Sequence, residues 1–179
     1  MADLNSALAS NVDIEKIHEN DKRVESLTSV VREMVKNIVD DACKDLDVYM
    51  EQIDEILCDK DSPVSDTELE DFTLNLPSLL YLVSSRREEL RIKEDVAKAV
   101  HKDVYNRVRE KAQGTVADKD TAADLAAQSE AITQIVLQRA GSTIKTREEA
   151  AWEMLNSVKK VLTRRVAELE LSRQAGGLI

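Results

Sequence analysis

Apolar residues recur at helical spacing through the first third of the chain. Between Val24 and Ile56 they follow one another at steps of three or four residues, which average about 3.5. That interval is typical of a helix that lies against another helix. It predicts a helix from about Asp21 to Leu57, ended by Pro63 because proline disfavours helical backbone in the residue before it. The stripe consists of Val24, Leu27, Val31, Met34, Ile38, Ala42, Leu46, Tyr49, Ile53 and Ile56.

The segments on either side of this helix are less regular. Residues 1–20 carry scattered apolar positions and indicate an N-terminal arm, either frayed or folded into a short helix. Ser65, followed three residues later by Glu68, has the form of a capping box and predicts a short acidic helix through Phe72. Pro77 is then expected to open a new helix, since the first helical turn tolerates its missing N–H.

Two long helical patterns follow. The first carries apolar residues at intervals of seven and is expected to end at about Ala112. Residues 114–120 are interpreted as a loop, after which Asp120 or Thr121 caps the second helix. Gly141 lies inside that second pattern and predicts either a kink or close packing of two helices, because glycine is costly in a helix interior.

The chain is therefore predicted to be all-α. A long acidic N-terminal helix precedes an antiparallel helical hairpin, in agreement with only four glycines, two prolines and five aromatic residues in 179. A rod of helices encloses little volume, so we expect it to oligomerise through its heptad-like faces. The predicted units are an N-terminal arm (1–20), an acidic helical module (21–76), a basic helical hairpin (77–174) and a flexible tail (175–179).

Charge divides the chain at the same place. Residues 1–77 carry 7 Lys/Arg and 20 Asp/Glu, a net charge of −13, whereas residues 78–179 carry 18 and 15, a net charge of +3. Exposed charges more than about 10 Å apart are screened at ordinary salt, so each half presents its own field. The net charge of −10 hides a basic half that tolerates or attracts a polyanion.

The sequence lacks the residue patterns of a metal site and of a phosphate-binding loop. Neither His18 nor His101 lies at metal-ligand spacing from a cysteine, and the four glycines form no phosphate-binding loop. We therefore expect no enzyme activity, metal or cofactor. Cys43 and Cys58, about 22 Å apart on one helix, are interpreted as reduced thiols. Without a membrane-spanning run of ~20 apolar residues or a signal-peptide pattern, the expected location is the cytoplasm, that of a host cell if a phage encodes the protein.

Basic residues gather in two groups along the predicted hairpin. One surrounds Tyr105, and the other, with four positive and no negative charges over residues 159–165, follows Trp152. A basic groove beside an aromatic that stacks on a base is typical of single-strand binding proteins. The plainer interpretation of the basic residues is a solvated helix face. The plainer interpretation of Trp152 is a place in the core, and for Trp152 we favour it. The candidate nucleic-acid-binding residues are Lys98, Lys102, Arg107, Arg109, Lys111, Lys159, Lys160, Arg164 and Arg165.

Short motifs within residues 78–176 carry a family resemblance. They are Ser84-Ser85-Arg86-Arg87-Glu88 with Glu89-Leu90-Arg91-Ile92, Trp152-Glu153-Met154-Leu155, Leu162-Thr163-Arg164-Arg165 and Arg173-Gln174-Ala175-Gly176. In these motifs the hairpin resembles the bacteriophage recombination mediator UvsY family. The family's basic motif falls on residues 100–104, where His101 replaces a lysine and Asp103 an arginine. The DNA contact has then either been lost or moved to Lys98, Lys102, Arg107 and Arg109.

The resemblance implies an all-helical, ring-like homo-oligomer that binds single-stranded DNA and helps a RecA-like recombinase displace the single-strand binding protein. The expected function is thus a non-enzymatic recombination mediator in DNA recombination and repair. Its acidic residues 1–77 would recruit a basic partner or shield the basic face. A helical scaffold or virion-associated structural protein without DNA binding is the alternative. A third interpretation, an acidic mimic of DNA, rests on residues 40–71.

Overall fold

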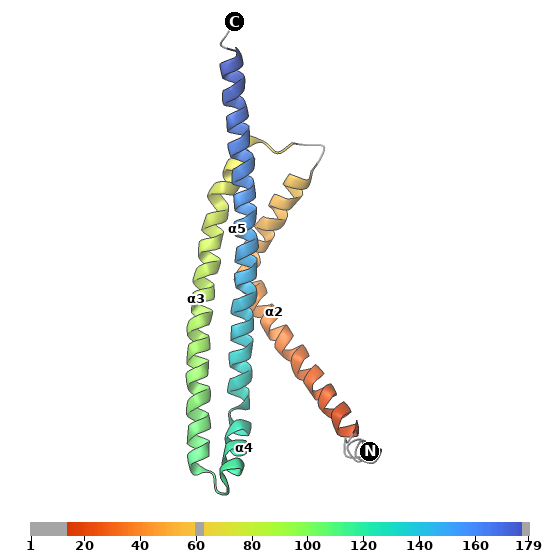
Figure 1. Ribbon diagram of the computed structural model, residues 1–179, viewed down its shortest axis with the longest axis vertical. Coiled ribbons are helices and arrows are strands. Elements are labelled where there is room, and N and C mark those ends of the chain that lie inside the picture. Colours follow the sequence, from red (N-terminus) through yellow and green to blue (C-terminus); the bar gives the residue numbers. More distant parts are fainter. Residues whose placement is uncertain (1–13, 60–62, 177–179) are drawn as a thin grey trace, which may run out of the picture.

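The computed structural model describes residues 14–59 and 63–176, which form four helices. They are α2 (Ile14–Cys58), α3 (Asp66–Lys111), α4 (Val116–Ala126) and α5 (Gln128–Gly176). No strand occurs in the described ranges, so the prediction of an all-α fold is confirmed. α3 and α5 lie side by side along the long axis as an antiparallel hairpin, α4 lies at the turn between them, and α2 crosses the pair at an angle (Figure 1).

Capping boxes begin α3 and α4. The Ser65 hydroxyl accepts a hydrogen bond from the Glu68 backbone N–H at 3.2 Å, and the Glu68 carboxylate accepts one from the Ser65 backbone N–H at 2.7 Å. This confirms the predicted cap. α4 begins in the same way, since Thr115 donates its backbone N–H to the Asp118 carboxylate at 2.9 Å. The prediction of a loop up to a cap at residues 120–121 is therefore wrong.

Pro77 lies inside α3, which corrects the prediction that it opens a new helix. A proline in a helix interior removes a backbone hydrogen bond and costs about 3 kcal/mol or more. Burial of the neighbouring turns offsets this cost. Phe72, Leu76 and Leu80 follow one another at steps of four residues, and Leu76 has no exposed surface. Packing of this face therefore holds α3 continuous through the proline.

The ends of the long helices also differ from the predictions. α2 begins at Ile14 rather than Asp21, so the last residues of the predicted arm are helical. α5 extends to Gly176, into the predicted tail. Residues 1–13 and 177–179 lie outside the described residues, and the predictions for them concern that part of the chain.

Gly141 is an ordinary position inside α5. A Cβ built there has no neighbouring atom within 4 Å, so the predicted close packing of two helices is wrong. α5 is a single helix that runs straight in Figure 1, so the alternative, a kink, is absent as well. The residue that does require glycine is Gly114, whose φ of +115° reverses the chain after α3.

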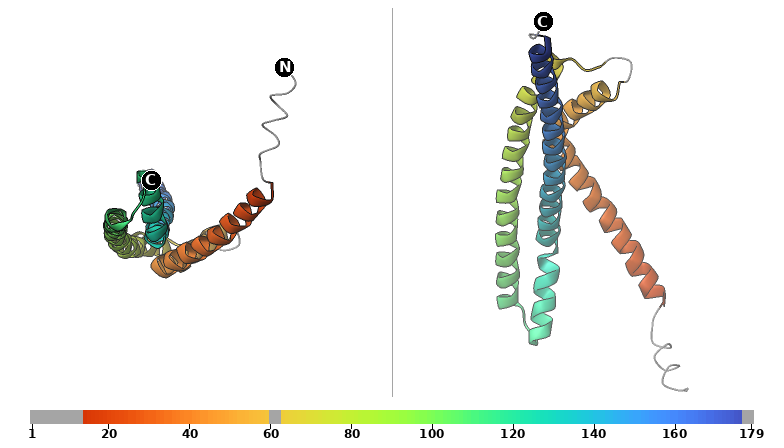
Figure 2. Two further views of the ribbon diagram at one scale, coloured as in Figure 1. Left: turned by 90° about the horizontal axis from the view of Figure 1, so that it is seen from below. Right: turned by 45° about the horizontal axis from the view of Figure 1, so that its top comes forward.

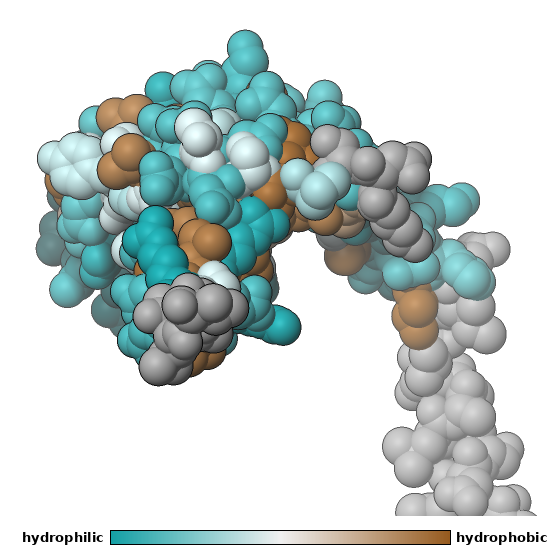
Figure 3. Space-filling model, turned by 90° about the horizontal axis from the view of Figure 1, so that it is seen from above, coloured by the Kyte–Doolittle hydropathy of each residue, from teal (hydrophilic) through white to brown (hydrophobic). Residues whose placement is uncertain are grey.

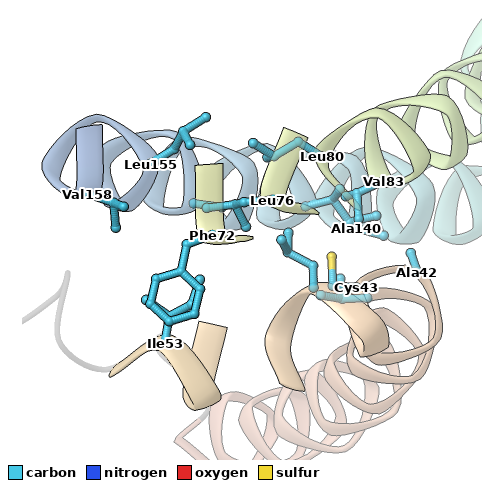
Figure 4. Packing of buried hydrophobic residues seen from close by; sticks show 14 of the residues in the cluster. Ala42, Cys43, Ile53, Phe72, Leu76, Leu80, Val83, Ala140, Leu155 and Val158 are labelled. Atoms are coloured by element: carbon cyan, nitrogen blue, oxygen red, sulfur yellow. The ribbon is translucent and has the colours of Figure 1, made fainter. Parts of the chain in front are cut away.

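The core lies where the three long helices meet. Side chains from α2, α3 and α5 point toward one another there, with Ile53 and Cys43 facing Phe72, Leu76 and the α5 residues (Figure 4). The rings of Tyr49 and Phe72 meet edge to face, with their centroids 6.2 Å apart. The buried members are Val39, Ala42, Cys43, Leu46 and Ile53 of α2, Leu69, Phe72, Leu76, Leu80, Val83 and Leu90 of α3, and Ala140, Ile144, Ala151, Leu155 and Val158 of α5.

α2 covers only one half of the hairpin. We call residues 66–90 and 137–176 the docked half and residues 91–136 the bare half. The first part of α2, which we call the α2 arm (residues 16–34), extends away from the hairpin into solvent (Figure 2). In the bare half, buried hydrophobic side chains are limited to Ala123, Ala127 and Val136 among the described residues. The hairpin thus has a full core at one end and a thin seam at the other.

Candidate nucleic-acid interface

The two predicted basic groups lie at opposite ends of the hairpin. Arg165 of α5 contacts Asp66 at the first residue of α3, whereas Arg109 lies in the last turn of α3. Asp66 and Arg109 are 43 residues apart on one helix, which places them about 65 Å apart at 1.5 Å per residue. The nine predicted residues therefore do not form one site within a single chain.

In the group in the bare half, the two arginines are held by carboxylates. Arg107 forms an ion pair with Asp103 one turn earlier. Arg109 donates to Asp120 at 2.5 Å, and the Tyr105 hydroxyl donates to the same carboxylate at 3.2 Å. Burial and this hydrogen bond raise the pKa of Tyr105. The two contacts with Asp120 join α3 to α4, so Tyr105 and Arg109 hold the turn of the hairpin, whereas Arg107 pairs within α3.

The other members of that group are exposed lysines. Lys98, Lys102 and Lys111 all lie on the surface of α3. Lys98 and Lys102 lie one turn apart, whereas Lys111 follows nine residues later, so the three spread over about 20 Å of helix. They offer separate positive charges to a polyanion, but they do not line one hollow together.

The group in the docked half surrounds a shallow hollow on one face of α5. Lys159, Lys160 and Arg164 line it together with Asn156 and Thr163, and no carboxylate is among its lining residues. Ammonium, guanidinium, amide and hydroxyl donors are the groups that bind phosphate oxygens. Arg164 also pairs with Glu168 at 2.8 Å, but both side chains are exposed, and an exposed pair of this kind is weak enough to exchange partners.

Arg165 has a structural role that the sequence did not reveal. Its guanidinium donates to the Val64 carbonyl at 2.6 Å and to the Asp66 carboxylate at 2.9 Å. It ties the start of α3 to α5 from a half-buried position. Of the four basic residues between 159 and 165, three therefore face the hollow and one holds the fold together.

Trp152 extends the basic face by an aromatic. The interpretation of Trp152 as a core residue is wrong, because half of its surface (50%) is exposed. Trp152, Asn156 and Lys160 are spaced four residues apart and so lie on one side of α5. Trp152 also lines a second hollow, between α3 and α5, with Tyr81, which is 75% exposed. Trp152 thus lies between the first hollow and a second one, in which it meets the exposed Tyr81.

The floor of the aromatic hollow holds a buried ion pair. Glu148 is buried and pairs with the half-buried Arg87 through one carboxylate oxygen, while its other oxygen, Oε1, has no hydrogen-bond partner among the described residues. Burial raises the pKa of Glu148, and the charge of Arg87 opposes that shift.

The acidic helix lies on another side of α5. Arg147 donates to Asp47 and, at 3.2 Å, to Asp40 of α2, and Arg86 donates to the Asp41 carbonyl at 2.6 Å. Burial raises the pKa of Asp47, opposed by Arg147. At 100° per residue, Trp152 lies about 140° around α5 from Arg147. α2 therefore neutralises Arg86 and Arg147 and leaves the face with Trp152 uncovered.

Two other site types have no support in the described ranges. No group of three or more His, Cys, Asp or Glu side chains there is arranged to hold a metal ion. Within residues 14–59 and 63–176, none of the helices has the length and apolarity needed to cross a membrane. Comparison of the chain with protein-family models, curated proteins and solved structures finds no match.

Proposed function

We propose that this protein is a non-enzymatic, single-stranded DNA-binding recombination mediator that assists the loading of a RecA-like recombinase. One observation carries the DNA-binding part. A single face of α5 presents the exposed Trp152 and, on the following turns, a hollow lined by Lys159, Lys160 and Arg164 without a carboxylate. The motifs shared with the UvsY family support the mediator part of the proposal.

The chemistry of this face fits a single strand better than a duplex. The three basic side chains bind successive phosphates, and each contact releases counterions, which makes binding depend on salt. Trp152 offers an aromatic plane to an unstacked base, a contact worth about 1–3 kcal/mol in single-strand binding proteins. In a duplex the bases are stacked and out of its reach.

The sole tryptophan of the chain supplies the test of DNA binding. Titrating the full-length protein with an oligonucleotide should quench Trp152 fluorescence, and the affinity should fall with rising salt. Replacing Lys159, Lys160 and Arg164 together by Gln removes three phosphate contacts and should reduce the slope of log K against log salt by about 2.

The matched control replaces Lys98, Lys102 and Lys111 by Gln, which removes the same charge from the bare half. This variant should keep most of the wild-type slope. An equal loss in both triple variants would show that charge alone, without the α5 face, attracts the DNA. Absence of quenching by single strands at low salt would refute the assignment.

The mediator step needs a separate assay. A RecA-like recombinase should assemble faster on single strands coated with single-strand binding protein when this protein is added. The acidic α2 then serves to recruit a basic partner, in place of shielding the DNA-binding face that it does not cover. DNA binding without faster assembly would show that this protein binds single strands but does not act as a mediator.

A helical scaffold protein is the second candidate, and the exposed apolar surface of the bare half favours it. Val96 and Val100 are 57% and 44% exposed on α3, as expected of a surface that another protein covers. This candidate predicts assembly without any salt-sensitive affinity for DNA. The fluorescence titration distinguishes the two.

A further inference from the structure

An apolar groove runs between α3 and α5 in the bare half. Ile92, Val96 and Val100 form its α3 wall and are all exposed, by 59%, 57% and 44%. Its α5 wall consists of Ser129, Glu130, Thr133 and Leu137. The groove extends for about 12 Å along α3, which is a little more than two helical turns. A row of three exposed β-branched residues on one helix forms a ridge against which a further helix can pack.

This groove continues the surface on which α2 already lies. Ile38 of α2 sits at the boundary of the two halves, in a notch lined by Lys93 and Leu137. Lys93 and Leu137 also line the groove of the bare half. The site therefore begins where α2 leaves the hairpin, and a helix of the same character would extend the packing that α2 starts.

The α2 arm carries the complementary surface. Its stripe includes Val24, Leu27 and Met34, which are 59%, 40% and 47% exposed. These residues span about 15 Å, enough to cover the groove. The stripe continues through Ile38 into Ala42 and Leu46, which are buried against the hairpin. Hydrophobic residues are also visible along α2 in the space-filling view from above (Figure 3).

The arm does not lie in the groove of its own chain. α2 is one helix from Ile14 to Cys58, and it changes direction where it crosses the hairpin (Figures 1 and 2). Beyond this bend the arm extends away from the hairpin. Docking of the arm in its own groove would require a further change of direction, whereas an arm from a second molecule can approach freely.

We infer that the α2 arm of one copy docks in the groove of the bare half of a second copy. The contact buries the apolar side chains of both surfaces, which the single chain leaves in water. The apolar stripe of α2 then packs along its whole length. After Ile38 it packs on its own hairpin, and before Ile38 it packs on the second copy. The inference does not depend on DNA binding, so either can fail without the other.

Light scattering on the full-length protein tests the assembly. The wild-type chain should form dimers or larger closed assemblies, whereas Leu27→Glu in the arm and Val96→Glu in the groove should each give a monomer with unchanged helix content. Val161→Glu replaces an apolar residue of similar exposure (40%) in the docked half and should leave the assembly intact. A monomeric wild type, or assembly that persists in both variants, overturns the inference.

Cross-linking between two differently labelled copies tests the pairing of surfaces. In a Cys58→Ser background, copies with Leu27→Cys are mixed with copies carrying Ile92→Cys, Val96→Cys or Val100→Cys, and treated with a short bismaleimide. At least one mixture should yield a product of twice the 20.0 kDa chain mass. A mixture with Val161→Cys should not. The proposed contact is contradicted when none of the three groove mixtures yields this product, or when only the Val161→Cys mixture does.

Discussion

The two halves of the hairpin differ in what packs on α3, which is α5 together with α2 in the docked half and α4 with the first turns of α5 in the bare half. In the docked half, α2 supplies Val39, Leu46 and Ile53, and large side chains of α3 and α5 are fully buried against them. In the bare half the buried hydrophobic residues are limited to Ala123 and Ala127 at α4 and Val136 of α5. Without α2, larger apolar residues of α3 such as Val96 and Val100 thus stay in water, and a further helix is needed to complete a core.

The ion pairs follow the same division. In the docked half, Arg147 and Arg165 reach across between helices that are far apart in sequence. In the bare half, Arg107 pairs within one turn and Arg109 reaches only to the adjoining helix α4. The docked half is therefore fixed by tertiary contacts, and the bare half by local ones. The following changes would sharpen or break this comparison.

The largest effect is expected from a truncation in the core of the docked half. Leu155→Ala removes a side chain with no exposed surface, and such changes cost about 2–5 kcal/mol. Val96→Ala in the bare half should change the free energy of unfolding by about 0.5 kcal/mol or less, measured at a dilution at which the chain is monomeric. Urea unfolding followed by circular dichroism measures both. Equal losses would show that the halves are equally packed.

A smaller effect is expected when the ionic contact between α2 and α5 is removed. Arg147→Ala leaves Asp40 and Asp47 without their shared partner and should cost about 1.5–3 kcal/mol, the range for hydrogen bonds to charged groups. Lys145→Ala breaks an exposed pair with Glu149 and should cost about 0.5 kcal/mol or less. Limited proteolysis within α2 should accelerate only in the first variant. If both behave alike, the long-range pair does not hold α2.

At the boundary of the halves, Gly141→Ala should stabilise the protein. Gly141 lies one turn after Leu137, and a methyl group there meets no atom within 4 Å. Alanine is favoured over glycine in a helix interior by about 1 kcal/mol. Thermal unfolding should therefore shift upward. A downward shift would indicate that the two ends of α5 must move relative to each other.

The smallest expected effect concerns the two capping boxes, one at each end of the hairpin. Hydrogen bonds from Ser65 lower the pKa of Glu68, and those from Thr115 lower the pKa of Asp118. Because folding lowers these pKa values, the stabilisation is complete above the ordinary values of 4.5 and 3.8 and is lost as the pH falls through the lower folded-state values.

Glu68→Gln measures this loss at the docked end. The variant keeps an acceptor for Ser65 without the charge, so it should be less stable than the wild type at neutral pH and approach it below pH 4.5. Asp118→Asn makes the same comparison at the bare end. Urea unfolding over a pH series provides the values. A difference that does not change with pH would exclude a contribution from the carboxylate charge.

Much of the fold follows from the spacing of apolar residues. The stripe from Val24 to Ile56 predicted α2, and the Ser65–Glu68 pattern predicted the start of α3. The prediction that Pro77 opens a new helix was wrong. It followed the local preference of proline for the first helical turn, whereas burial of Leu76 keeps α3 continuous. Local propensity carries no information on such tertiary compensation.

The candidate site was predicted only in part. Counting charges located the basic group of α5, but it could not show that Arg165 is turned to Asp66 or that Tyr105 is held by Asp120. The exposure of Trp152 was also missed, since an aromatic beside Ala151 and Leu155 fits a core equally well. The helical position of Trp152 relative to Asn156 and Lys160 was the available signal, and it indicates a shared surface.

The reactivity of Cys43 reports how often α2 detaches from the hairpin. Its thiol has no exposed surface and points into the contact between α2 and the hairpin, and burial raises its pKa to about 11. An alkylating reagent can therefore reach it only while α2 is lifted from the hairpin, whereas Cys58 is exposed at all times. The rate at which Cys43 is alkylated, relative to Cys58, thus counts the opening events of a single helix in the native protein.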